Sequence, residues 1–206
     1  MMAKLSNYDK AVEGARALFL THDPAALAKK YPVDYDGGAI TLNFCGEPYR
    51  IDCKTGQVDC PGRPGYAPGH NELMALWDML CYADAAPTLS GRWCPTASLA
   101  GIASGQDDSH LLVRFRDAVA AAPDRLEDAR RALHARSGPG GDFAMVIPVF
   151  DWFPCLFRFW EADDEFPAKT LFYWDENARR FMHYETLWFV NMYLSQRIWA
   201  AVEGRG

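Results

Sequence analysis

The sequence has no long hydrophobic run, and this absence excludes a membrane-spanning helix. Its densest apolar stretch, residues 144–160 of 206, is broken by two prolines, an aspartate and an arginine. A helix that spans a bilayer needs about 20 consecutive apolar residues. The N-terminus also lacks the apolar core of a secretory signal. We therefore expect a cytoplasmic protein that makes no contact with a membrane.

Clustered positive charge is missing as well. The 21 Lys and Arg residues are outnumbered by 27 Asp and Glu, which gives a formal net charge of −6, and no basic run is longer than a pair. Proteins that bind nucleic acid need clustered Lys and Arg to neutralise the phosphates. The composition therefore disfavours a nucleic-acid partner.

The common cofactor motifs are absent too. The six cysteines form no Cys-x-x-Cys pair, and the spacing of Cys45, Cys53 and Cys60 matches no common zinc module. Isolated cysteines in the cytosol usually stay reduced and fill apolar space. The glycine-rich segment 138–141 lacks the Lys-Ser/Thr ending of a phosphate-binding loop. The sequence therefore identifies no cofactor.

Aromatic side chains are abundant and unevenly spread. Of the 28 Phe, Trp and Tyr residues, 16 lie at or after Phe150. Phe157, Phe159 and Phe172 alternate with other residues, as positions in a sheet do. Two interpretations follow: the rings form a core or a dimer interface, or they line a pocket for a flat ligand.

Hydrophobic periodicity predicts a single α+β domain over residues 1–206, with an antiparallel sheet and packed helices. Its parts are N-terminal helices in 7–30, a first ββα unit in 39–83, a helical middle in 109–135 and a second ββα unit in 144–202. The two ββα units share the order strand, strand, turn, short strand and helix. They could be a structural repeat joined in one sheet, or two similar hairpins that arose by chance.

Local signals predict several details of these elements. Asp23 and Pro24 are typical of a helix start, as N-cap and first helical residue. Asn71 is the expected N-cap of the helix in the first ββα unit. Residues 137–141 are expected to be a flexible connector, and residues 179–182 a short extended segment.

Several segments together resemble a known family. They are Asp23–Pro24, Tyr35–Gly37, Phe44–Ile51, Leu76–Tyr82 with Gly91–Trp93, Trp160–Ala168 and Leu171–Asp175. The chain resembles the family catalogued as domain of unknown function 3786, which is found mainly in anaerobic bacteria and archaea. The family commonly has Leu-Phe-Asp in the last of these segments. This chain departs from that pattern, because Tyr173 and Trp174 stand between Phe172 and Asp175. Some members carry an iron–sulfur domain, for which this chain has no cysteine cluster. The resemblance implies no reaction.

Four carboxylates gather in the segment 161–165, which we call the acidic loop. Crowded carboxylates repel one another. The repulsion raises the pKa of at least one of them, or the group recruits a hard cation such as Mg²⁺ or Ca²⁺. The alternative is a solvated hairpin loop. The predicted ligand-binding residues are Trp160, Glu161, Asp163, Asp164, Glu165, Phe166 and Asp175, and the metal candidates among them are Asp163, Asp164 and Glu165.

Three functions fit these features. The first choice is a protein that binds a small molecule or cofactor, or an accessory protein, in anaerobic metabolism. The second is an enzyme that uses carboxylate- or metal-assisted chemistry at the acidic loop. The third is a homodimeric interaction module without catalysis. A nucleophilic set such as Cys155, His183 and Glu185 is supported by residue type alone.

Overall fold

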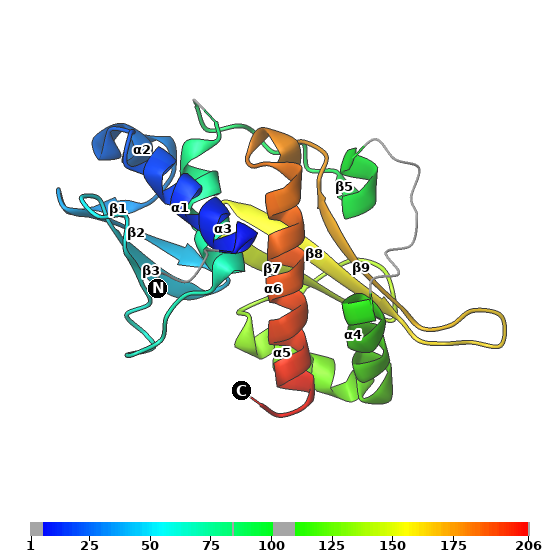
Figure 1. Cartoon of the computed structure of the whole chain (residues 1–206). Coiled ribbons are helices and arrows are strands. Elements are labelled where there is room, and N and C mark those ends of the chain that lie inside the picture. The colour runs from blue at the N-terminus through cyan, green and yellow to red at the C-terminus, as the bar shows by residue number, and fades with distance from the viewer. Residues whose placement is uncertain (1–5, 84, 101–109, 206) are drawn as a thin grey trace.

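The computed structural model describes residues 6–83, 85–100 and 110–205, and it confirms the α+β class. The strands form two antiparallel sheets (Figure 1). The small sheet has the order β1 (Asp34–Tyr35), β2 (Ala39–Phe44), β3 (Glu47–Asp52), β4 (Val58–Asp59). The large sheet has the order β5 (Trp93–Pro95), β9 (Lys169–Asp175), β8 (Phe153–Trp160), β7 (Phe143–Phe150), β6 (Arg136–Ser137). The two ββα units thus contribute to separate sheets, so the expectation that they join in one sheet is wrong, while the repeat itself stays a prediction.

Six α-helices accompany the sheets in the described residues. They are α1 (Asn7–Phe19), α2 (Pro24–Lys30), α3 (His70–Cys81), α4 (His110–Ala121), α5 (Leu126–Ala132) and α6 (Tyr184–Val202). Three 3₁₀ turns are η1 (Thr96–Ala100), η2 (Pro123–Arg125) and η3 (Ala178–Arg180). No helix in the described ranges is long and apolar enough to cross a membrane.

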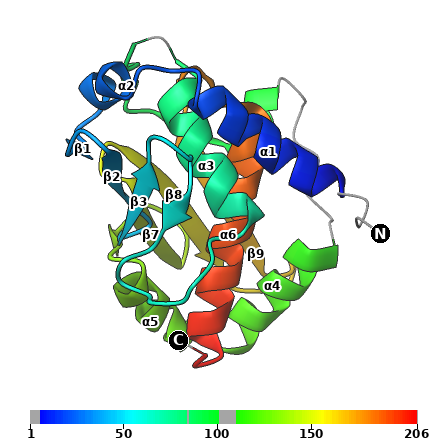
Figure 2. The same cartoon turned by 60° about the vertical axis from the view of Figure 1, so that its left-hand side comes forward.

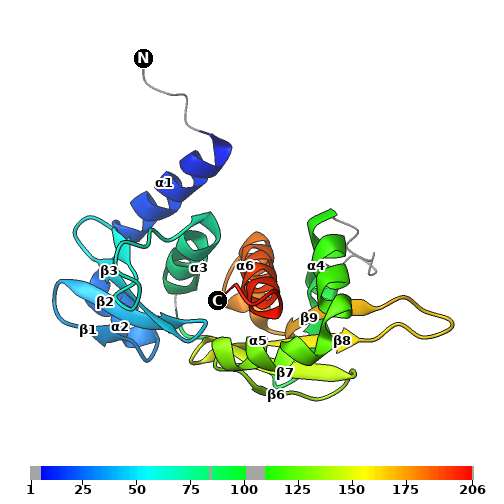
Figure 3. The same ribbon diagram turned by 90° about the horizontal axis from the view of Figure 1, so that it is seen from below.

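Helix α6 lies across one face of the large sheet, between α3 and α4 (Figure 3). Helix α1 packs against α3, and its N-terminal end points away from both sheets (Figures 2 and 3). The arrangement leaves α6 as the central element of the helical layer, so its side chains pack against several partners.

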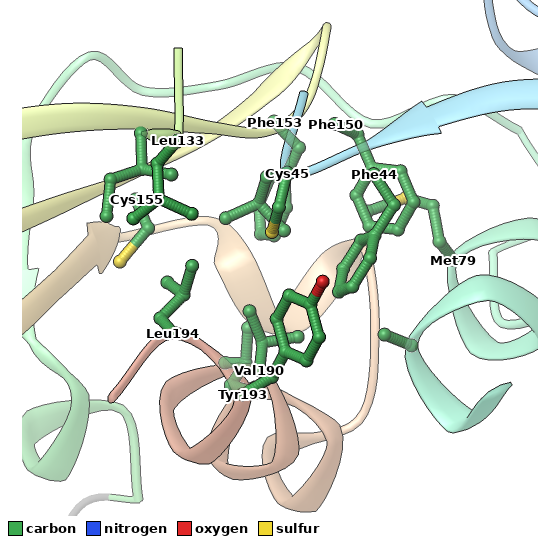
Figure 4. Close-up of a cluster of buried hydrophobic side chains, with 14 of the residues drawn as sticks. Phe44, Cys45, Met79, Leu133, Phe150, Phe153, Cys155, Val190, Tyr193 and Leu194 are labelled. Atoms are coloured by element: carbon green, nitrogen blue, oxygen red, sulfur yellow. The ribbon is translucent and has the colours of Figure 1, made fainter. Parts of the chain in front are cut away.

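The aromatic concentration near the C-terminus is mainly core. The fully buried rings of this region are Phe150, Phe153, Phe157, Phe159, Trp174 and Phe181. Phe153 stacks on Trp174 with ring centroids 5.1 Å apart and on Phe181 at 4.7 Å. Figure 4 shows that Phe44 and Cys45 from the small sheet join this core, facing α6. The two sheets therefore share one hydrophobic core.

The turn between β2 and β3 contains only two residues. Phe44 pairs with Glu47, so Cys45 and Gly46 alone form the turn, with φ of 51° and 82°. Positive φ at both positions is the geometry of a type I′ hairpin, which glycine adopts at little cost. The Cys45 N–H donates a 2.9 Å hydrogen bond to the carbonyl of Val149 and so joins the two sheets.

Helix boundaries show where the local signals succeed and fail. The Asp23 carboxylate accepts the Ala25 N–H at 3.0 Å, which confirms the predicted start of α2. The prediction of Asn71 as the N-cap of α3 is wrong. Gly69 holds that position, because the Glu72 carboxylate accepts the Gly69 N–H at 2.7 Å.

Two predicted irregular segments are ordered differently from expectation. The prediction of an extended segment at 179–182 is wrong. The 3₁₀ turn η3 and the turn after it are closed by backbone hydrogen bonds, such as that from the Arg180 N–H to the Asn177 carbonyl at 2.8 Å. The connector begins within β6, and Gly138 packs tightly on the next strands. A Cβ at Gly138 would lie 2.7 Å from Leu156 Cδ1. The glycine is thus part of the packing of the sheet.

Candidate functional site

The acidic loop connects β8 to β9 and extends beyond the body of the molecule (Figure 1). All its residues are exposed, and so is Phe166, at 66%. Asp163 accepts the backbone N–H groups of Glu165 and Phe166 at 2.9 and 2.7 Å, and these bonds lower its pKa. The loop is therefore a formed turn on the surface. Trp160 is half-buried at the end of β8.

Carboxylates outside the loop do not complete a metal site around it. Across the part of the chain that the structure describes, no group of three or more His, Cys, Asp or Glu side chains could hold a metal ion. The metal role of Asp163, Asp164 and Glu165 stays a prediction.

Asp175 lies at the opposite end of β9, ~20 Å along the strand from the loop. It is only 4% exposed, and its carboxylate accepts the N–H groups of Ser90, Gly91 and Asn177 at 2.8–2.9 Å. Burial raises the pKa of Asp175, but these hydrogen bonds outweigh it and hold the pKa below its ordinary value. The geometry therefore separates Asp175 from the other predicted ligand-binding residues and ties the strand to the segment before β5.

Replacing Asp175 by asparagine is expected to lower the free energy of unfolding at neutral pH by about 1–3 kcal/mol, because charged acceptors make the stronger hydrogen bonds. A lowered native pKa stabilises the fold above the unfolded pKa and loses that effect as the pH falls through the native value. The difference between wild type and variant should therefore shrink below about pH 3.8. Urea unfolding at neutral pH and near pH 3 measures it. An equal difference at both pH values would contradict this role.

A groove of about 330 Å³ lies away from the acidic loop. Its walls come from the end of α2, the segment before β5, the β7–β8 turn and the turn after η3. The lining residues are Lys30, Tyr31, Pro32, Ala86, Pro87, Thr88, Leu89, Trp152 and Phe181. Most of these side chains are apolar, and the volume is that of a small-molecule site.

One wall of the groove is a stack of aromatic rings. Tyr31 and Trp152 stack with centroids 4.9 Å apart and planes 13° apart, and Trp152 stacks in turn on Phe150 at 5.4 Å. Tyr31 Oη and Trp152 Nε1 are buried and have no hydrogen-bond partner in the described ranges. Burial, helped by the charge of Asp78, raises the pKa of Tyr31 to about 12, so its phenol keeps its proton at neutral pH. The wall thus contains two buried donors without an acceptor.

Lys30 joins the groove to the end of α3. Its ammonium group donates hydrogen bonds to the carbonyls of Leu80 and Ala83, the latter at 2.7 Å. These carbonyls belong to the last turn of the helix and the residues after it, where a cation also interacts favourably with the helix dipole. The contact fixes α2, and with it Tyr31, against α3.

A carboxylate–imidazole pair joins α3 to the start of α6, because Asp78 lies on α3 and His183 is the N-cap residue of α6. Asp78 Oδ1 lies 2.7 Å from His183 Nδ1, and Asp78 Oδ2 accepts the His183 backbone N–H at 2.8 Å. The Asp78 side chain is 11% exposed and that of His183 is 58% exposed. The ring of Tyr82 packs edge-on against the imidazole at 4.3 Å. The carboxylate therefore fixes a histidine ring that remains open to solvent.

The structure does not assemble the nucleophilic set of Cys155, His183 and Glu185 that residue type alone supported. Cys155 is fully buried in the core (Figure 4), and burial raises the pKa of its thiol well above the ordinary value. A buried thiol with a raised pKa is a poor nucleophile. The carboxylate partner of His183 is Asp78, which is distant in the sequence, and no local pattern pointed to it.

A second group of polar residues, the polar cluster, joins β3, the loop before α3, α3 and α6. It consists of Glu47, Tyr49, Arg63, Tyr66, Glu72, Tyr193 and Arg197. Glu72 is almost fully buried, and its carboxylate accepts the hydroxyls of Tyr49 and Tyr66, the latter at 2.7 Å. Glu47 lies between Arg63 Nε at 2.7 Å and Arg197 Nη2 at 2.9 Å.

Charge within the polar cluster is balanced, because two guanidinium groups face two carboxylates. Burial raises the pKa of Tyr49 far above its ordinary value, so its hydroxyl acts as a donor. Arg63 also stacks over the ring of Tyr66, with its guanidinium carbon 3.6 Å from the centroid. We therefore infer a structural role for the polar cluster: it holds the proline- and glycine-rich loop 61–69, which precedes α3, against β3, α3 and α6.

Fold and site together define a two-sheet α+β protein with an apolar groove walled by aromatic rings. The model of one family, described as domain of unknown function (DUF3786), matches residues 23–197, and the chain belongs to this family. The match confirms the resemblance that the sequence motifs indicate. No curated protein and no solved structure matches the chain. Functional inference therefore depends on the site itself.

Proposed function

We propose that the protein binds a small, flat and mainly apolar ligand in the groove. The observation that carries this proposal is the apolar groove of about 330 Å³ with the stacked pair Tyr31–Trp152 on one wall. A flat ligand would pack its ring on this apolar wall, as ligands do in small-molecule sites.

A fluorescent probe tests the proposal. Anilinonaphthalene sulfonate is flat, carries acceptor oxygens and becomes bright in apolar surroundings. We expect saturable binding to the wild-type chain. Ala86 is exposed and lines the groove, so Ala86→Trp should fill the space without disturbing the core and weaken binding by at least about tenfold, which is 1.4 kcal/mol.

The matched control is Ala162→Trp, which adds the same ring to the exposed acidic loop. It should bind the probe as the wild type does. Equal binding by the wild type and Ala86→Trp would overturn the groove as the binding site. Loss of binding in Ala162→Trp but not in Ala86→Trp would instead favour the acidic loop.

The two other functions stay predictions. Carboxylate- or metal-assisted chemistry at the acidic loop would require a cation or substrate held by exposed carboxylates. A homodimeric module would require a stable interface between two copies, which a measurement of molecular mass in solution would detect.

A further inference from the structure

We propose that two copies of this chain associate through the face of the large sheet that is turned away from α6. In this dimer, the acidic loop of each copy lies against the cationic end of the partner's face. The dimer does not require a ligand in the groove, and it assigns a surface to the homodimer that the sequence left open. Three features support it: the strand register, the exposure of this face and charges that one chain leaves unpaired.

The strand register separates the two sides of the large sheet. Phe157 of β8 pairs with Phe172 of β9, and both rings belong to the hydrophobic core. Successive side chains along a strand point to opposite sides, so the adjacent residues face away from this core. These residues form the outer face, which consists of the pairs Leu156–Tyr173, Arg158–Leu171 and Trp160–Lys169.

The outer face is apolar and only partly covered. Figure 3 shows α3, α4 and α6 on one side of the large sheet, and among the described residues no α-helix packs on the other side. Trp160, Leu171 and Tyr173 are therefore half-buried. Gly138 packs on the fourth apolar residue, Leu156, which is fully buried. The uncovered face of an antiparallel sheet normally carries polar residues, so large apolar side chains here indicate an interaction surface.

The charges of the outer face are positive and unpaired. Arg158 places its guanidinium over the ring of Tyr173, 4.5 Å from the centroid, and its Nε donates to the Pro139 carbonyl at 2.8 Å. Lys169 is exposed. Neither cation forms an ion pair with a carboxylate in the described part of the chain. The outer face therefore offers two positive charges to a partner.

The acidic loop holds the opposite charge, and this charge is unpaired as well. None of its carboxylates forms an ion pair with a Lys, Arg or His side chain in the described ranges. The loop continues β8 and β9 beyond the end of the sheet (Figure 1), so it lies past the outer face of its own chain. One chain thus carries two complementary sets of charge that it does not bring together.

A two-fold axis in the plane of the sheet, perpendicular to the strands, brings the two sets together. It places the two outer faces against each other and reverses the strand direction of the second copy. Each acidic loop then extends over Lys169 and Arg158 of the other copy, while the apolar residues of both faces pack between the sheets. Sheets packed face to face lie about 10 Å apart, a gap that side chains fill. Because the same surface serves both copies, the interface closes with two chains.

Single-stranded nucleic acid is the alternative occupant of the outer face, because its bases stack on aromatic rings and its phosphates bind cations. The net charge of −6 and the acidic loop next to this face disfavour it, since both repel phosphates. A second copy instead brings its own carboxylates to the cations. The charge of the chain therefore favours self-association.

Sedimentation equilibrium of the full chain tests the dimer. We expect a species of twice the mass of one chain, with a Kd on the order of 10 µM, because small interfaces give weak complexes. Raising the NaCl concentration from about 0.05 M to about 0.5 M should weaken the dimer at least about fivefold, because salt screens the charge pairs. A wild-type chain that stays monomeric at about 200 µM, well above this Kd, would overturn the proposal.

A charge exchange tests the pairing itself. Lys169→Glu and Glu165→Lys change exposed side chains, and circular dichroism verifies that both variants fold. Each variant alone should dimerise at least about tenfold more weakly than the wild type, because like charges then meet across the interface. A mixture of the two variants should restore the dimer, since each copy meets the opposite charge on the other. Restoration in the mixture separates this effect from a change of loop structure within one chain.

Lys54→Glu is the matched control, because Lys54 is exposed in the turn after β3, on the small sheet, and should leave the Kd unchanged. Single variants that dimerise like the wild type, or a mixture that fails to restore the dimer, would overturn the pairing. Fluorescence anisotropy of a labelled oligouridine tests the other occupant, and we expect no binding. Binding by a monomeric wild-type chain that is lost in Lys169→Glu would assign the outer face to single-stranded nucleic acid and overturn the dimer.

Discussion

Replacing Glu72 by alanine is expected to lower the free energy of unfolding by about 3–5 kcal/mol. The carboxylate accepts hydrogen bonds from Tyr49, Tyr66 and the Gly69 backbone, and Arg63 lies 3.4 Å away. Its loss leaves the buried Tyr49 hydroxyl without this acceptor and reduces the compensation of the Arg63 charge. The substitution also removes the contact between the Glu72 side chain and the N-cap of α3.

Thermal and urea unfolding measure this effect. A domain of this size shifts its melting temperature by about 2–4 °C per kcal/mol, so Glu72→Ala should melt roughly 6–20 °C lower. Glu185→Ala is the matched control, because Glu185 also lies in the first turn of a helix but is exposed. It should cost less than about 1 kcal/mol, the value of a helix-dipole interaction. Equal losses in the two variants would contradict the structural role of the polar cluster.

Trp174→Ala should have an effect of similar size, about 3–5 kcal/mol. The ring is fully buried and stacks on Phe153, so truncation opens a cavity in the shared core. Trp174 Nε1 also donates to Asn191 Oδ1 at 3.1 Å, and Asn191 Nδ2 donates to Thr96 Oγ1 at 3.0 Å. The substitution therefore removes both packing and one donor of a buried hydrogen-bond chain.

Two further variants separate these contributions. Trp174→Phe keeps a ring in the core but leaves Asn191 Oδ1 without that donor, which should account for about 1–3 kcal/mol. Phe166→Ala truncates an exposed ring in the same β8–β9 hairpin and should cost no more than about 0.5 kcal/mol. Urea unfolding of all three variants measures the difference. A loss below about 1 kcal/mol for Trp174→Ala would show that the core does not depend on this ring.

Local signals predicted the parts of the fold that depend on local chemistry. The strands β2 and β3 alternate apolar and polar residues, and the Asp23–Pro24 start of α2 needs only neighbouring backbone groups. The strands β1 and β5 were missed, because two or three residues are too few to show a period. The division into two sheets depends on pairing between distant strands, which periodicity does not report.

The candidate site was harder to predict for the same reason. The acidic loop drew attention because its charges are adjacent in sequence. Tyr31 and Trp152 come from distant segments, and so do Asp78 and His183, which lie 105 positions apart. Asp175 looked like part of an acidic site, yet its carboxylate binds backbone N–H groups that only the folded chain brings to it. Residue type grouped His183 with Cys155 and Glu185, whereas its carboxylate partner in the structure is Asp78.

The turn at Cys45 and Gly46 also bears on how the chain reaches its native state. The Cys45 N–H meets the carbonyl of Val149, and Phe44 tilts against Phe150 with centroids 5.3 Å apart. The small sheet therefore gains these two contacts only when the C-terminal half of the chain is present. Such distant contacts give a high contact order, which slows folding and makes the two halves cooperative. During synthesis, the turn at Cys45 and Gly46 gains its contacts with Val149 and Phe150 only after the last third of the sequence has begun to emerge.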